Sequence, residues 1–255
     1  MRRVLLLLFP LLACGHAAAE RVARAAQPSP SASSWCAPEV ETLPGGICHV
    51  DGRRAGRRTL VIFLHGLIAR GTTWQWTQHR AMARNAKNLG FAVIMPTAPP
   101  VGPGGSGGFA WPGGAPLGES EEALIEPWMA ARRLLEARSG SPFDEVFVMG
   151  FSSGAYYASS LALRGRLDVG GYALFAGGAA STRPGADVKR RAPIFVGVCA
   201  KNPETAVGAR ALGSSLAIWN WPSRVDEQPI GHMFGDVHVA HALRYLQGRV
   251  PPTKS

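Results

Sequence analysis

Residues 146–154 read VFVMGFSSG, and a helical pattern over 153–164 overlaps their end. An unbroken apolar run such as 146–149 is typical of a strand that is buried on both faces. The glycines at 150 and 154 fit a sharp bend, because side chains there would collide with neighbouring elements. We therefore predict a buried strand, a tight turn that presents the Ser152 hydroxyl at the end of a sheet, and a helix that starts directly after it.

The same type of apolar run recurs along the chain from residue 58 onward. Further strands are predicted at 59–64, 91–95, 172–175 and 194–198, and helical patterns cover 73–89, 120–138, 153–164, 205–217 and 236–247. This alternation predicts an α/β fold with a mostly parallel central sheet and helices on both faces. We expect one such domain over residues 35–250.

Residues 96–118 interrupt the alternation. This stretch is rich in Pro and Gly, which excludes a helix or a central strand. Because it follows the carboxyl end of a predicted strand, it either shapes a ligand cleft around Phe109 and Trp111 or forms a surface loop.

The composition is that of a globular protein. Hydrophobic residues make up 46% and charged residues 17% of the 255 residues, which excludes a disordered or collagen-like chain. The net charge of +10 comes from arginines spread thinly along the sequence. Since no recognition motif accompanies this charge, we expect no nucleic-acid partner.

An export signal is predicted at the N-terminus. The apolar run 4–13 follows Arg2 and Arg3 and is too short to cross a bilayer, so residues 1–19 read as a signal peptide. Leu11-Leu12-Ala13-Cys14 resembles a lipobox, which would lipidate Cys14, while 17–19 fits ordinary cleavage. We favour the lipobox and expect an envelope lipoprotein, periplasmic or membrane-anchored; ordinary cleavage would give a secreted protein. Residues 20–34 then form a flexible tether, and 251–255 a tail.

Export makes the cysteines interpretable. Cys36 and Cys48 flank a short segment ahead of the core pattern, and in an oxidising compartment they form a natural disulfide pair. Cys199 ends an apolar run and is predicted to be a buried thiol.

Ser152 needs a base, because a hydroxyl is a poor nucleophile near neutral pH. His232 is our candidate, since it lies in the loop before the last predicted helix and follows the serine in chain order. The N–H of Ser153, at a helix start, could face a developing oxyanion. His65-Gly66 leaves the strand at 59–64, so the N–H of Leu67 is the second predicted donor. His238 and His241 lack an evident third ligand, and we expect no metal site.

These residues resemble the α/β-hydrolase family over roughly 58–248. The likeness is to secreted or lipid-anchored esterases of the carboxylesterase, phospholipase and polyhydroxybutyrate-depolymerase-like groups. His65-Gly66, Gly150–Gly154 and Gly231-His232 stand where that family has its oxyanion turn, nucleophile and base. The resemblance implies a serine esterase that forms an acyl-enzyme, needs no cofactor, and acts on a small-molecule or lipid-like ester.

One position departs from the family pattern. After the strand at 194–198 the family usually has an Asp, and here Asn202 stands in its place. Asn202 could still orient the imidazole of His232 through its side-chain oxygen, but it offers no charge. Glu204 and Asp226 are alternative acids, with Asp236 a further one. The departure keeps a second hypothesis open, a non-catalytic binding protein of the same fold; a peptidase or polyester depolymerase would use the same site.

Overall fold

A mixed sheet forms the centre of this computed structural model, which describes residues 35–113, 119–178 and 183–248. Over those ranges eight strands lie in the order β1-β2-β4-β3-β7-β8-β9-β10. From β4 to β10 all neighbours are parallel, while β1 and β2 add an antiparallel edge. The strands are β1 (Glu41–Leu43), β2 (Ile47–Asp51), β3 (Thr59–Leu64), β4 (Ala92–Met95), β7 (Glu145–Phe151), β8 (Gly171–Phe175), β9 (Ile194–Cys199) and β10 (Ser223–Gln228).

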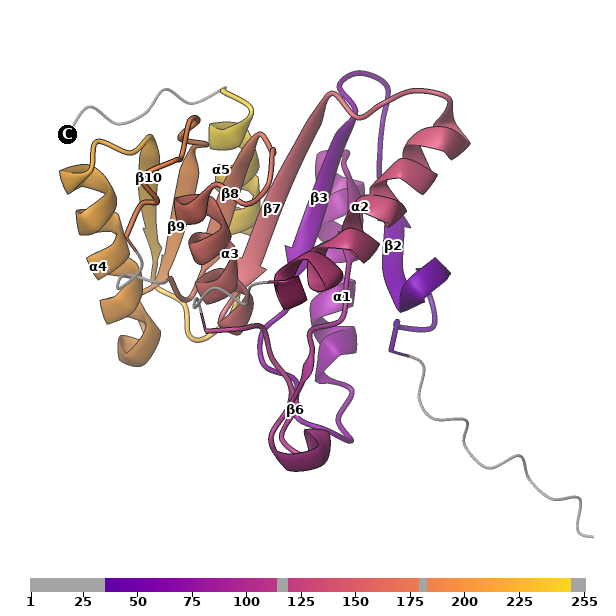
Figure 1. The fold of residues 1–255 in the computed structure, drawn as a ribbon, viewed down its shortest axis with the longest axis horizontal. Coiled ribbons are helices and arrows are strands. Elements are labelled where there is room, and N and C mark those ends of the chain that lie inside the picture. Colours follow the sequence, from indigo (N-terminus) through magenta and orange to yellow (C-terminus); the bar gives the residue numbers. More distant parts are fainter. Residues whose placement is uncertain (1–34, 114–118, 179–182, 249–255) are drawn as a thin grey trace, which may run out of the picture. The chain divides into compact units, whose positions relative to one another are not determined.

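Helices cover both faces of this sheet (Figure 1). They are α1 (Trp74–Leu89), α2 (Glu119–Ser139), α3 (Ser153–Arg164), α4 (Pro203–Ile218) and α5 (Asp236–Leu246). Alternate residues of β3 divide the core: Leu60, Ile62 and Leu64 pack with residues of α2, α3 and α4, while Val61 and Phe63 pack with residues of α1 and α5. The predicted mostly parallel sheet with helices on both faces is therefore confirmed.

Three features lie outside the strand ranges predicted from the sequence. They are the antiparallel edge, the opposite edge strand β10, and a small hairpin of β5 (Pro100–Val101) and β6 (Gly108–Phe109). The hairpin packs onto the turn after β3, since Ile68 and Phe109 exchange two backbone hydrogen bonds. Trp111 is buried against Trp128 and Tyr157. The base of the hairpin thus supports the turn after β3, while its tip, Gly102–Gly104 with Ser106 and Gly107, is exposed at the surface.

The N-terminal predictions lie outside the described residues. These are the signal peptide 1–19, the lipidated Cys14 and the tether 20–34, and the tail 251–255 lies outside as well. They stay predictions. Where the structure describes the chain, no helix is both long enough and apolar enough to cross a membrane. The disulfide between Cys36 and Cys48 is present and ties the segment before β1 to β2.

Candidate active site

Ser152 lies in a strained turn between β7 and α3. Its backbone has φ 52° and ψ −118°, a conformation that side chains rarely adopt. The flanking glycines are required by space: a Cβ at Gly150 would lie 2.3 Å from the carbonyl oxygen of Gly154, and one at Gly154 would lie 2.1 Å from that of Leu64. The bend predicted from the two glycines is thus present, with the Ser152 side chain at the carboxyl end of β7.

His232 reaches this serine from the other end of the chain. It lies in the loop between β10 and α5, and its Nε2 is 3.0 Å from the Ser152 Oγ. The imidazole packs against Phe151, with 5.0 Å between ring centroids. Partial burial lowers the pKa of His232, and the carboxylate of Glu204 counteracts part of that shift. The ring is therefore neutral near pH 7 and able to accept a proton.

The loop that carries His232 is anchored in the hydrophobic core. Phe234 is buried against Phe63, Phe151 and Phe175, with ring centroids 5.1, 5.4 and 6.2 Å away. The thiol of Cys199 donates to the Met233 carbonyl oxygen at 3.0 Å. Cys199 is thus the buried thiol that the sequence predicts, and burial raises its pKa. Phe234, which was not singled out in the sequence, anchors the loop through these three ring contacts.

The turn after β3 lies directly against Phe151 and Ser152. A Cβ at Gly66 would stand 2.9 Å from the ring of Phe151 and 3.3 Å from the Cβ of Ser152. The Gly66 N–H donates to Gln78 Oε1 and the Ile68 N–H to Phe109 O, both at 2.9 Å. For the Leu67 and Ser153 N–H groups, no acceptor is found within the described ranges. These two amides are the predicted oxyanion donors, and their neighbours are held in place.

His65 fixes this turn from the inside. It is buried, its Nδ1 lies 2.5 Å from the Gly66 carbonyl oxygen, and its Nε2 accepts the Ala98 N–H at 3.0 Å. That pattern requires a neutral ring with the proton on Nδ1. Burial also lowers the pKa of His65 to about 4. The residue is therefore a positioning group and not a second base.

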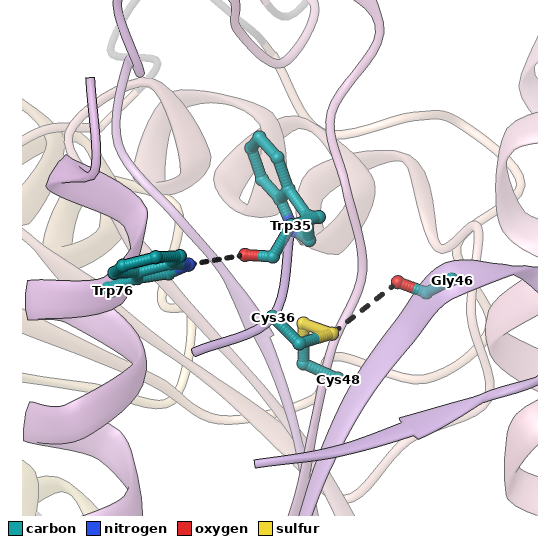
Figure 2. Close-up of a disulfide and its surroundings, with 5 residues drawn as sticks. All are labelled: Trp35, Cys36, Gly46, Cys48 and Trp76. Carbon is teal, nitrogen blue, oxygen red and sulfur yellow. Dashed lines mark hydrogen bonds between the residues drawn. A yellow bond between two sulfur atoms is a disulfide. The ribbon is translucent and has the colours of Figure 1, made fainter. Parts of the chain in front are cut away.

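Aromatic rings pack around His65, and Trp35 contacts both His65 and Phe109. The Trp35 ring lies 5.2 Å from His65 and 5.0 Å from Phe109 between centroids. Its carbonyl oxygen accepts the indole N–H of Trp76 at 3.2 Å, and the next residue is the disulfide-bonded Cys36 (Figure 2). Sequence reasoning missed Trp35, which stands next to a predicted disulfide but far from every motif.

The candidate acids have different surroundings. Asn202 caps α4: its Oδ1 accepts from the Thr205 N–H and hydroxyl. The Asn202 oxygen, which was expected to face His232, is therefore engaged at the start of α4. The motif Asn-Pro-Glu-Thr contained that signal, since Asn is a favoured N-cap and Pro a favoured first helical residue.

Two of the carboxylates are committed elsewhere. Asp226 on β10 lies 3.1 Å from His241 Nδ1 and 3.6 Å from His238 Nε2, both on α5. Asp236 is paired with Arg84 at 2.8 Å. Glu204, in the first turn of α4, is the acid whose charge acts on the His232 ring.

A cavity of about 560 Å³ opens beside His232. Its walls come from α1, from Phe151, and from the chain between Gln228 and His238. Ser152, Phe109 and Trp111 are not part of its lining, so this cavity is not the cleft expected around the two aromatic residues.

Together, the parallel sheet, the helices on both faces and the Ser152–His232 pair at its carboxyl edge define an α/β-hydrolase fold. Solved structures agree. A carboxylesterase from Mesorhizobium loti matches with TM-score 0.56 and 22% identity, covering 82% of this chain and 99% of its own. XC6422 from Xanthomonas campestris, an α/β serine hydrolase without a lid, matches with TM-score 0.53 and 18% identity over 85% and 95%.

Esterase PE8 gives TM-score 0.51 and 19% identity over 79% of this chain and 97% of its own. No protein-family model matches the chain, and no curated protein matches its sequence. At these identities the likeness establishes the fold, which is that of the α/β hydrolases.

Proposed function

We propose that this protein is a serine hydrolase that cleaves carboxylic esters through an acyl-enzyme. The observation that carries the proposal is the 3.0 Å contact between His232 Nε2 and Ser152 Oγ at a strained turn. Nucleophile and base within hydrogen-bond distance, beside backbone amides, are what acyl transfer requires. The similarity to esterases and serine hydrolases supports the same class.

The proposed reaction has two halves. The Ser152 Oγ attacks the ester carbonyl carbon while His232 Nε2 takes the hydroxyl proton, and the carbonyl oxygen becomes an oxyanion between the Leu67 and Ser153 N–H groups. The carbon–alkoxy bond then breaks, and His232 returns the proton to the departing oxygen. Water next attacks the acyl-serine with His232 again as base, which releases the carboxylic acid and restores the serine.

Glu204 is the acid that we propose for stabilising the charged form of His232. The other candidates are engaged with Thr205, with α5 or with Arg84, whereas the charge of Glu204 already acts on this imidazole. A carboxylate near the ring stabilises the imidazolium that forms when Ser152 loses its proton. Its position in the first turn of α4 places it past the carboxyl end of β9, near where the family has its acid.

Turnover of a short p-nitrophenyl ester tests the proposal. The parent is expected to hydrolyse it, and Ser152→Ala is expected to lose at least about a thousandfold in kcat. Ser214→Ala, a change on the exposed side of α4, is the matched control and keeps full activity. If parent and Ser152→Ala are equally slow, ester hydrolysis is contradicted and the alternative of a binding protein with this fold is favoured.

The proposed location follows from the sequence alone. We propose export directed by the signal within 1–19, with cleavage before Cys14 and a lipid anchor on Cys14, so that the domain works in the cell envelope. A disulfide between Cys36 and Cys48 is in keeping with an oxidising compartment. Metabolic labelling with a fatty-acid analogue would report lipidation, and Cys14→Ser is expected to abolish the label.

A further inference from the structure

The cavity beside His232 has a composition that indicates what it binds. Three large apolar side chains at its walls are half exposed: Trp74 at 49%, Met233 at 54% and Val237 at 53%. Phe151 and Phe234 also line it. Apolar surface of this kind, gathered in one concave site of about 560 Å³, is typical of a small-molecule pocket.

The charged groups of the cavity are already paired. Arg84 makes a two-point contact with Asp236 across the space between α1 and α5, and Arg80 pairs with Glu39. Neither guanidinium is therefore available as the partner of an anionic ligand without breaking an existing pair. The occupant that fits is an uncharged, apolar group.

The position of the cavity relative to the catalytic pair indicates which half of an ester it receives. His232 lines it, whereas Ser152 and the amides of Leu67 and Ser153 do not. In ester cleavage the base returns its proton to the departing alkoxy oxygen, so the alcohol part lies on the imidazole side of the carbonyl. The acyl part stays attached to Ser152 after that bond breaks.

We infer that the cavity formed by Trp74, Phe151, His232, Met233, Phe234 and Val237 is the subsite for the alcohol part of the substrate. The substrate class is an ester of an uncharged alkyl or aryl alcohol. This inference rests on the proposed ester hydrolysis and adds its specificity. The enzyme would then discriminate among esters by their alcohol part, because each further methylene buried in the cavity lowers the free energy of the transition state.

Two ester series separate the halves of the substrate. The alcohol series consists of the ethyl, butyl and hexyl esters of acetic acid. The acyl series consists of the ethyl esters of acetic, butyric and hexanoic acid. The acid released from each ester is titrated at constant pH. For the parent we expect kcat/KM to rise about fourfold for each buried methylene of the alcohol, from the free energy of burying such a group. A flat alcohol series would overturn the inference.

A double variant, Met233→Gln with Val237→Gln, removes apolar surface without changing charge. Both side chains are half exposed, so the core is not opened. We expect the slope of the alcohol series to fall and the slope of the acyl series to remain. Val207→Gln on α4, also at an exposed valine, is the matched control and keeps both slopes.

The outcomes distinguish the inference from the function it rests on. If the parent hydrolyses no ester of either series, the proposed function has failed. If the parent is active but the double variant flattens the acyl series, or changes both slopes alike, the cavity does not bind the alcohol and the inference is wrong.

Discussion

Gly66 has no side chain, and the side chains of Phe151 and Ser152 lie against the space where one would stand. A methyl group at this position would stand 3.3 Å from the Ser152 Cβ and 2.9 Å from the Phe151 ring. We expect Gly66→Ala to lower kcat by about tenfold, because these contacts force a shift of only part of the 1 Å displacement that costs about a hundredfold at reacting groups. Steady-state kinetics with a p-nitrophenyl ester measure it.

Gly113→Ala is the control for this prediction. A Cβ at Gly113 meets nothing within 4 Å, so this variant should match the parent in activity and stability. If Gly66→Ala also retained parental kcat, the turn after β3 could not be packed against the nucleophile as described.

The pH dependence of kcat/KM tests the environment of His232. Because partial burial lowers the pKa of this imidazole, the base stays neutral and active below the usual midpoint near 6.5. Activity should be full at neutral pH and lost as pH falls through the lowered pKa. Glu204→Gln removes the charge that raises this pKa, so its acidic limb should move to still lower pH. A shift of that limb to higher pH would contradict the assignment.

Glu204→Gln should also lower kcat by about a hundredfold, because the carboxylate no longer stabilises the His232 imidazolium. The loss is smaller than for a buried acid, since solvent and salt screen an exposed charge. Asn202→Ala is the comparison. It removes the cap of α4 and should cost about 1 kcal/mol of stability while leaving the pH limb in place.

At the scale of elements, the segment before β1 supports the turn after β3. Trp35 contacts His65 and Phe109, and its chain is fixed by the disulfide at Cys36. We expect Trp35→Ala to lower kcat about tenfold with KM nearly unchanged, because the amide of Leu67 loses its fixed position. Trp35→Phe, which keeps an aromatic ring, should recover most of the loss. Equal defects in both variants, or a change in KM alone, would exclude this positioning role.

The buried strands were predictable because each carries a continuous apolar run, as 59–64 and 194–198 show. The edge strands β1 and β2 were not, since three and five residues of mixed polarity give no period to recognise. The proximity of Ser152 and His232 was predictable from chain order and local context. The surroundings of Asn202, Glu204 and Trp35 depend on how distant elements pack, which spacing along the chain does not reveal.

At the scale of the whole molecule, the disulfide closes a loop with a sequence separation of 12. Such a loop is expected to stabilise the fold by up to about 3 kcal/mol. Denaturant unfolding with and without a thiol reductant should show a drop of that size. The Cys36→Ser, Cys48→Ser double variant should start at the lower stability and not respond to the reductant. An unchanged unfolding midpoint on reduction of the parent would contradict this expectation.

The central claim is that Ser152 becomes covalently acylated with His232 as its base. Rapid quenching during turnover of a p-nitrophenyl ester, followed by peptide mass spectrometry, tests it most directly. The account predicts one acyl group for each protein molecule, on the peptide that contains Ser152, and none when His232 is replaced by Ala. Ester turnover with the acyl group on a different residue would contradict it.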